Sequence, residues 1–232
     1  MIMPLVSCIM PTRDRRRYVP LAIAGFLRQD HPAKELVVVD SGTDPVADLI
    51  PAGVPVRYHR VAGPIPVGSA RNIACDLAVG TLIVHWDDDD WQCPDRLSRQ
   101  VAALAPGRAD ICGTTSALYY RAVDETAWRF AWPAGRPRWF SGQTLAYRRE
   151  LWADTPFYDL EQGEDHAFVA KTAARSRAVA LAGDLLVAMA HPHNTVPKTD
   201  RNIYCSPAPL TEITDRLGPD LAAYRAAGGG LT

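Results

Sequence analysis

The sequence of 232 residues lacks several features that define common protein classes. No apolar run approaches the roughly 18 residues that span a bilayer, and residues 1–5 lack the basic region and cleavage site of a signal peptide. Five cysteines are scattered without any CxxC spacing, which argues against disulfides and structural zinc. The net charge of -1 creates no field that attracts nucleic acid. We therefore expect a cytoplasmic protein with no transmembrane segment and no nucleic-acid partner, and peripheral binding to the inner face of the membrane is left open.

Two nucleotide-binding motifs are also missing. No GxxxxGK[ST] loop occurs, which excludes a P-loop NTPase, and the absence of GxGxxG disfavours a dinucleotide cofactor. Lysine is scarce, because only positions 34, 171 and 198 among the 25 basic residues are lysine. Arginine is the better bidentate partner of phosphate, but a GC-rich genome explains the same bias. The composition alone therefore assigns no phosphate site.

Apolar β runs alternate with helical patterns in the first half of the chain. A strand that ends at a proline or an aspartate is followed by a segment with apolar residues on one helical face. This alternation predicts an α/β fold with a mostly parallel sheet and helices on both faces. The predicted strands are 5–10, 36–39, 54–59 and 81–86, with the third at an edge, and the predicted helices begin near Pro20, Gly68 and Pro94.

The second half has a different pattern. Residues 109–147 are typical of short strands rich in Tyr, Trp and Thr, with a turn around 133–135, and a helix is expected from Glu164. Apolar runs return at 179–190, and the tail from Pro207 is predicted to be helical with flexible final glycines. No linker interrupts the chain, so we expect a single domain, 1–232. Within it we expect a nucleotide-sugar-binding half (1–106), a smaller mixed β acceptor-side half (107–206) and a C-terminal helix with a flexible tail (207–232).

Four consecutive aspartates, Asp87–Asp90, follow the fourth predicted strand. Neighbouring carboxylates repel by about 1 kcal/mol in water and about 4 kcal/mol at an effective dielectric of 20, so a buried cluster needs a cation or protons. Hard oxygen ligands suit Mg²⁺ or Mn²⁺. Ligands of open parallel sheets bind at the carboxyl ends of the strands, where Asp40 also lies. The run therefore predicts a divalent-cation site for a diphosphate, against the alternative of a solvated turn that favours the next helix.

Five ordered motifs resemble the family-2 glycosyltransferases with the GT-A fold. They are Val6–Thr12, the segment Glu35–Gly42, Gly68–Asn72, the aspartate run before Pro94, and Gly163-Glu164-Asp165. Each motif is weak alone, but the order of all five is specific, and the resemblance extends to about Thr195. It implies an inverting transferase that takes its sugar from a nucleoside-diphosphate-sugar.

The resemblance implies roles by position. A nucleotide pocket would use Pro11, Thr12, Arg13, Asp40 and Ser41, with Arg71 near the base or diphosphate. The aspartates would divide between the donor (Asp87, Asp88) and the metal (Asp89), while Asp90 is undecided between the site and its support. Two departures from the common pattern, Arg13-Asp14 and Ser41, leave the nucleotide base open.

Asp165 resembles the family's general base, although a helix start also favours an acid there. Glu164 would orient the loop or meet the acceptor. His191 resembles a histidine that some members add to the metal shell, with His193 as the rival. The alternative for both is a surface histidine or one that hydrogen-bonds to the backbone. On the acceptor side, Trp139 and Gly142 belong to a segment that could line a sugar pocket or pack in the core. The arginines Arg15–Arg17 are expected in a solvated loop, with contact to phosphates as the alternative.

We therefore predict a divalent-cation-dependent inverting glycosyltransferase acting in surface polysaccharide or glycoconjugate synthesis. Its acceptor would be a sugar, a lipid-linked or another hydroxyl. A sugar nucleotidyltransferase would normally carry a glycine- and basic-rich phosphate loop near the first strand. That loop is absent, and only the basic residues in Arg13–Arg17 resemble it weakly. A retaining transferase and a non-catalytic nucleotide-sugar-binding module of the same fold also remain as alternatives.

Overall fold

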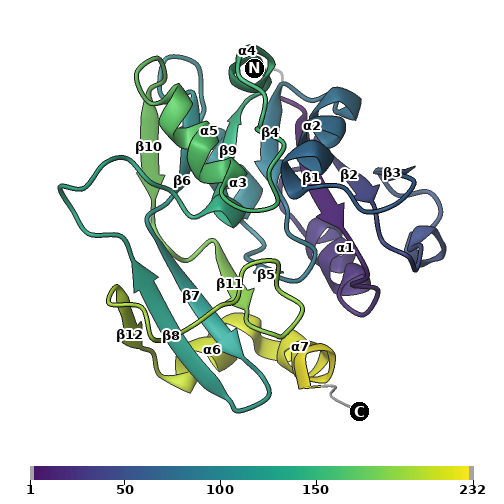
Figure 1. The fold of residues 1–232 in the computed structure, drawn as a ribbon, viewed down its shortest axis with the longest axis vertical. Coiled ribbons are helices and arrows are strands. Elements are labelled where there is room, and N and C mark those ends of the chain that lie inside the picture. Colours follow the sequence, from purple (N-terminus) through teal and green to yellow (C-terminus); the bar gives the residue numbers. More distant parts are fainter. Residues whose placement is uncertain (1–2, 230–232) are drawn as a thin grey trace.

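A computed structural model describes residues 3–229, which form two sheets with helices around them (Figure 1). The large sheet has the strand order β10-β6-β9-β4-β1-β2-β3. Its strands β1, β2, β3 and β4 are mutually parallel, whereas β9 runs antiparallel to both β4 and β6. The bounds are β1 Val6–Thr12, β2 Lys34–Asp40, β3 Val56–Arg60, β4 Leu82–His85, β6 Ile111–Thr114, β9 Ala146–Arg148 and β10 Ala178–Leu181.

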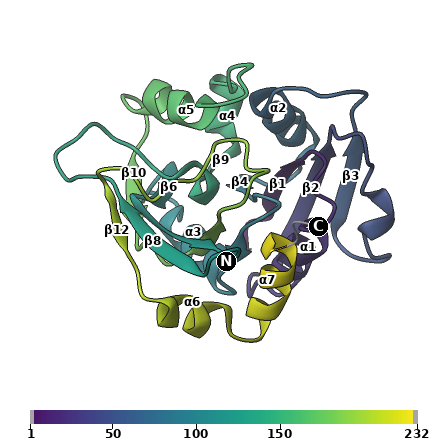
Figure 2. The same ribbon diagram turned by 60° about the horizontal axis from the view of Figure 1, so that its bottom comes forward.

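Helices cover both faces of the large sheet because its central strands are apolar on both faces. Alternate residues of β1 divide between two cores: Met10 packs with α1 and α3, whereas Ile9 packs with α2, α4 and α5. Figure 2 shows α2, α4 and α5 together on one side of this sheet. The helices are α1 Val19–Leu27, α2 Val67–Leu77, α3 Arg96–Ala103, α4 Arg149–Asp154 and α5 Glu164–Thr172.

The small sheet has the order β12-β8-β7-β11-β5 and packs on the C-terminal helices through a third apolar core (Figure 2). Its hairpin, β7–β8, projects beside the large sheet (Figure 1). The elements are β5 Trp91–Gln92, β7 Ser116–Arg121, β8 Thr126–Ala131, β11 Leu186–Met189, β12 Cys205–Pro207, α6 Leu210–Leu217 and α7 Leu221–Gly229. Short 3₁₀ turns η1 Ala47–Leu49, η2 Gly142–Thr144 and η3 Gly218–Asp220 complete the described chain.

The strands expected in the first half are present, and β3 lies at an edge as its proline suggested. The turn expected around 133–135 is present at Ala134 and Gly135, within the long loop of residues 132–141, while the β7–β8 hairpin reverses earlier, at 122–125. The two expected halves interleave, since β6, β9 and β10 join the large sheet and β5 joins the small one. The boundaries at 106 and 206 stay predictions, and residues 230–232 of the expected flexible tail lie outside the described residues.

None of the helices within residues 3–229 combines the length and the apolar character that crossing a bilayer requires.

Candidate functional site

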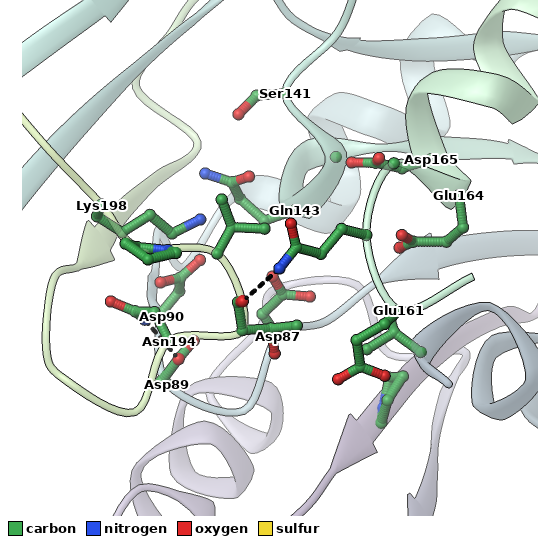
Figure 3. Close-up of a pocket in the computed structure, with 18 of the residues that line it drawn as sticks. Asp87, Asp89, Asp90, Ser141, Gln143, Glu161, Glu164, Asp165, Asn194 and Lys198 are labelled. Carbon is green, nitrogen blue, oxygen red and sulfur yellow. Dashed lines mark hydrogen bonds between the residues drawn. The ribbon is translucent and has the colours of Figure 1, made fainter. Parts of the chain in front are cut away.

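A cavity of about 760 Å³ opens at the carboxyl ends of β1 and β4, between the two sheets. The aspartate run lies on one side of it, next to the loop of residues 190–204. Glu164 and Asp165, at the start of α5, lie on the other side in the view of Figure 3. The structure thus brings into one cavity two acidic motifs that are far apart in the sequence, Asp87–Asp90 and Glu164-Asp165.

The aspartate run turns into the cavity directly after β4. Oxygen atoms of Asp87, Asp89 and Asp90 all lie within 4.8 Å of one another, which is a geometry that can hold a metal ion. Asp88 is not part of this group of three, and its Oδ2 instead accepts a hydrogen bond of 2.6 Å from Thr12 Oγ1 on β1. Three carboxylates of hard oxygen suit Mg²⁺ or Mn²⁺. The chemistry of the donor set therefore fits the divalent cation that the sequence predicted.

Burial and nearby charges give Asp88, Asp89 and Asp90 different pKa values. Burial, with the charges of Asp89 and Asp87, raises the pKa of Asp90 well above its usual value. Burial also raises the pKa of Asp88 to about 6, against the opposing charge of Arg15. For Asp89 burial is outweighed by Arg15 and His191, which lower the pKa to about 2. Of Asp88, Asp89 and Asp90, Asp89 is thus the one most firmly held as a carboxylate.

Arg15 reaches this run, so the expectation of a solvated arginine loop is wrong for that residue. Its Nη1 lies 2.9 Å from Asp88 Oδ1 and 3.0 Å from Asp89 Oδ2. Its Nη2 donates to the backbone carbonyl of His193 over 2.7 Å. Arg16, by contrast, is more exposed and pairs with Asp48. The arginine therefore supplies a positive charge to the aspartates and ties the 190–204 loop to them.

A second cation at the site was missed from the sequence. Lys198 is half-buried and lines the cavity. Burial disfavours its charged form, but the nearby Tyr119, Asp90, Asp87 and Asp89 outweigh that effect and raise the pKa of Lys198. Figure 3 shows it beside Asp90 and Asn194. Its only signal in the sequence is that lysine is rare in this chain.

His191 also meets the aspartates, whereas His193 does so less directly. His191 Nε2 lies 3.0 Å from Asp89 Oδ2, and its ring stacks on Tyr18 with centroids 4.5 Å apart. Asn194 Nδ2 donates to the same carboxylate oxygen over 3.1 Å. His193 lines the cavity and contributes its backbone carbonyl to Arg15. Metal binding by either histidine stays a prediction.

Arg71 of α2 joins the two acidic motifs. It is buried, with Nε 3.1 Å from Glu164 Oε1 and Nη2 3.3 Å from Asp87 Oδ1. Its Nη1 is buried without a hydrogen-bond partner among the described residues. Burial opposes the charged form, but Asp87, Glu164 and Asp165 outweigh it and raise the pKa of Arg71. The guanidinium therefore fixes α5 relative to the aspartate run.

Asp165 packs against the η2 turn. A Cβ atom at Gly142 would overlap the Asp165 carboxylate, so this close approach requires glycine. Asp165 Oδ1 accepts a 2.7 Å hydrogen bond from the His166 amide, and its side chain lines the cavity (Figure 3). The geometry leaves a carboxylate at the cavity wall, which is the requirement for a general base.

Three buried side chains fix the η2 turn from behind. His85 Nδ1 donates to the Gly142 carbonyl over 2.9 Å, Arg96 Nη2 to the Gln143 carbonyl over 2.9 Å, and Gln100 Nε2 to the Thr144 carbonyl over 2.7 Å. Burial lowers the pKa of His85 well below its usual value, so the ring is neutral and carries its proton on Nδ1. The turn that touches Asp165 is thus rigidly seated on β4 and α3.

The predicted donor-binding residues separate into two groups. Pro11, Thr12, Arg13 and Ser41 line the cavity, and Arg13 pairs with Glu161 across it. Asp40 does not belong to the lining: it is fully buried, and its carboxylate accepts hydrogen bonds from the amides of Gly42 and Val46 and from Tyr58 Oη. The structure gives Asp40 a role in shaping the following loop, and its contact with a nucleotide stays a prediction.

Comparison with known proteins identifies the class. The model of the glycosyl transferase family 2 matches residues 7–162, so the chain belongs to that family. It is 35% identical over 100 residues to WcaA of Escherichia coli, named as a glycosyl transferase of colanic acid biosynthesis, covering 41% of this chain and 36% of that protein. It is 33% identical over 103 residues to TuaG of Bacillus subtilis, named as a teichuronic acid biosynthesis glycosyltransferase, covering 42% and 41%. The aligned segments span less than half of either relative's length.

Solved structures share the fold. S. aureus TarS (residues 1–349) superimposes with a TM-score of 0.66 at 22% identity, over 80% of this chain and 60% of that one. The mannosyltransferase PcManGT from Pyrobaculum calidifontis, in complex with GDP-Man and Mn²⁺, gives a TM-score of 0.65 at 20% identity over 88% and 59%. The predicted family and the predicted α/β fold of GT-A type are confirmed.

Proposed function

We propose that the chain is a divalent-cation-dependent, inverting glycosyltransferase that moves a sugar from a nucleoside-diphosphate-sugar to an acceptor hydroxyl. The observation that carries the proposal is the shared cavity, with Asp87, Asp89 and Asp90 on one side and Asp165 on the other. One acidic set suits a diphosphate with its cation, and the other carboxylate suits an acceptor hydroxyl. Family membership and the fold support the same reaction.

The donor would lie against the aspartate run. Pro11, Thr12, Arg13 and Ser41 are the candidates for the nucleotide part, and Arg71 and Arg15 place positive charge near the diphosphate. Asp89 is the first candidate for the metal ligand, with Asp87 and Asp90 completing the oxygen set. When bound, a divalent cation neutralises the charge that grows on the departing diphosphate. The PcManGT structure, in complex with GDP-Man and Mn²⁺, supports a divalent cation together with a nucleotide-sugar donor.

Asp165 would act as the general base. It takes the proton of the acceptor hydroxyl while the hydroxyl oxygen attacks the anomeric carbon from the face opposite the diphosphate. The bond from that carbon to the phosphate oxygen breaks, its electron pair leaves with the nucleoside diphosphate, and the configuration inverts. General base catalysis contributes about 10²–10⁴-fold to such a step. Glu164 is tied to Arg71 and so serves the position of α5 rather than the acceptor.

The names of the relatives support a place in polysaccharide synthesis, since WcaA and TuaG are named for colanic and teichuronic acid biosynthesis. The solved TarS complexes with UDP and UDP-GlcNAc, and PcManGT with GDP-Man, support a nucleotide-sugar donor without choosing its base.

A donor screen tests the proposal. Thermal unfolding of the protein is followed with UDP-, GDP-, dTDP- and CMP-sugars, with Mn²⁺ and with EDTA. We expect one diphosphate donor to raise the Tm only with metal, and Asp89→Ala to abolish that rise. Release of nucleoside diphosphate should fall at least 100-fold in Asp165→Asn, which keeps donor binding. No donor-dependent shift in any arm would refute the proposal.

The alternatives give different results in the same experiment. A nucleotidyltransferase would form pyrophosphate from a sugar phosphate and a nucleoside triphosphate. A binding module would bind the donor with Mn²⁺ and release no nucleoside diphosphate. A retaining transferase would give a product of the donor's anomeric configuration, which NMR of the product distinguishes.

A further inference from the structure

Aromatic side chains are concentrated at one end of the cavity. The sequence has 19 aromatic residues (5 Phe, 6 Trp and 8 Tyr). Six of them line this single cavity. Four of the six, Phe130, Trp132, Trp139 and Tyr204, come from β8, the 132–141 loop and the end of the 190–204 loop, and are called the aromatic wall here.

The aromatic wall is not part of the folding core. Its four members are only half-buried, and none of them belongs to the three apolar clusters found among residues 3–229. They pack instead on one another: Trp132 stacks on Trp139 with centroids 5.4 Å apart, and Phe130 lies 5.1 Å from Trp139. Large aromatic rings left half-open on a cavity offer flat apolar faces to a ligand.

The aromatic wall is joined to the base through Trp139. The Trp139 indole Nε1 donates to His166 Nε2 over 2.8 Å, and His166 directly follows Asp165. An indole N–H can only donate, so His166 accepts at Nε2 and carries its proton at Nδ1. A ligand ring lying on the aromatic wall is therefore placed next to the carboxylate that would receive its proton.

A polar group at the same cavity lacks a partner. Gln143 is 7% exposed and lines the cavity, and its Nε2 has no hydrogen-bond partner among the described residues. A buried donor left unpaired costs about 1–3 kcal/mol, so a ligand oxygen that accepts from it recovers that cost. Gln143 is adjacent to Gly142, whose backbone touches Asp165. The unpaired donor, the aromatic wall and the base thus belong to one surface.

These three features fit a pyranose ring. A sugar ring has apolar C–H faces that pack on aromatic rings and hydroxyl edges that accept from an amide. An acyl chain would leave the Gln143 donor unpaired, and an extended peptide would present few flat faces to the rings. We propose that the acceptor is a saccharide whose terminal ring lies on the aromatic wall, accepts a hydrogen bond from Gln143 and presents its hydroxyl to Asp165. This inference rests on the proposed function, because it assigns the acceptor of that reaction.

The experiment measures acceptor binding without turnover. Methyl glycosides of glucose, galactose, mannose and N-acetylglucosamine are titrated by saturation-transfer NMR, with Mn²⁺ and the nucleoside diphosphate that stabilises the protein. We expect at least one glycoside to bind through its ring C–H protons. Trp132→Ala and Tyr204→Ala should each weaken it at least tenfold, and Gln143→Met about tenfold. The matched control is Ile203→Ala, because Ile203 precedes Tyr204 on the same loop but is 88% exposed and lies outside the cavity lining.

The donor screen separates failure of this inference from failure of the proposed function. Donor binding with Mn²⁺ in the Trp132 and Tyr204 variants should equal that of the wild type. A wild type that binds donor but no glycoside would overturn the inference, as would unchanged glycoside affinity in folded Trp132→Ala and Tyr204→Ala. If either alanine variant fails to fold, Trp132→Leu and Tyr204→Leu replace it, with the same expected loss and the same overturning result. Preferential binding of a serine peptide or of lipid vesicles would also overturn the inference.

Discussion

Gly142 and Asp165 are in contact because Gly142 has no side chain. A Cβ atom at this position would occupy the place of the Asp165 carboxylate. The η2 turn cannot retreat to make room, since His85, Arg96 and Gln100 hold its three carbonyl groups from behind. The proposed base can therefore take this position only because residue 142 of the rigid turn has no Cβ atom.

Gly142→Ala should displace Asp165 and lower turnover about 100-fold, because a general base loses most of its effect when it leaves hydrogen-bond reach. Donor binding should persist, since the aspartate run lies on the other side of the cavity. The measurement is the rate of nucleoside diphosphate release at saturating donor and acceptor. Gly25→Ala is the control: a Cβ there meets only ordinary contacts of 3.8–4.0 Å, and full activity is expected. Undiminished turnover in Gly142→Ala would contradict the role of Asp165.

Arg15→Met should make the metal-free protein less stable and its response to Mn²⁺ larger. Arg15 pairs with Asp88 and Asp89 in a site that is mostly shielded from water, so its removal takes away a counter-charge from two buried carboxylates. A divalent cation can supply that charge. We expect a Tm several degrees below wild type in EDTA and a greater rise of Tm on adding Mn²⁺.

Arg16→Met is the matched control for this experiment. Arg16 is the next residue, but its partner Asp48 is exposed, and solvent-exposed ion pairs add little to stability. Its Tm in EDTA and its Mn²⁺ response should equal those of the wild type. Equal responses of the two variants would show that Arg15 does not share the carboxylates with the metal.

The sequence predicts the large sheet better than the small one. Strands β1, β2 and β4 are buried on both faces, so each is a continuous apolar run that stands out from its surroundings. In the small sheet β5 has two residues and β12 has three, and they exist because partners far along the chain pair with them. Such short strands carry no periodic signal of their own.

The candidate site likewise has some residues that the sequence predicts and others that it does not. The aspartate run was predictable because four like charges behind a buried strand are costly without a function. Arg15 was not, since a run of three arginines is typical of a solvated loop and only the fold brings it to Asp88 and His193. The contact between Gly142 and Asp165 likewise joins residues whose separation in the sequence says nothing about their distance.

Arg96→Met should destabilise the protein by about 2–4 kcal/mol. Arg96 is fully buried, and burial lowers its pKa to about 10. Its guanidinium donates to the carbonyls of His85 and Gln143, and each buried acceptor left unpaired costs about 1–3 kcal/mol. Relief of the buried charge offsets part of that sum. Urea unfolding measures the change, and Arg99→Met, on the same helix but with a part-exposed ion pair to Asp184, should cost less than about 1 kcal/mol.

Asp90→Asn should stabilise the metal-free protein at neutral pH. Burial and the neighbouring charges raise the folded-state pKa of Asp90 well above 3.8. The folded state thus holds this proton more tightly than the unfolded chain does, and the wild type loses stability as pH rises from about 4 through the raised pKa. Asparagine keeps the acceptor for the Met189 amide without the charge. The variant should therefore unfold at a higher temperature than wild type at pH 7.5 in EDTA, with the difference vanishing near pH 4.

Asp110→Asn gives the control of opposite sign for the Asp90 prediction. Hydrogen bonds from Arg177 lower the pKa of Asp110, so its charged form stabilises the folded state above about pH 4 and this contribution is lost as pH falls. Asp110→Asn should therefore lower the Tm at pH 7.5, where Asp90→Asn raises it. On addition of Mn²⁺, the Tm of the wild type should rise above that of Asp90→Asn. Only the wild type keeps the Asp90 carboxylate, whose charge the cation can neutralise. If Asp90→Asn has a lower Tm than wild type in EDTA at pH 7.5, repulsion among the carboxylates of the run does not destabilise the metal-free protein.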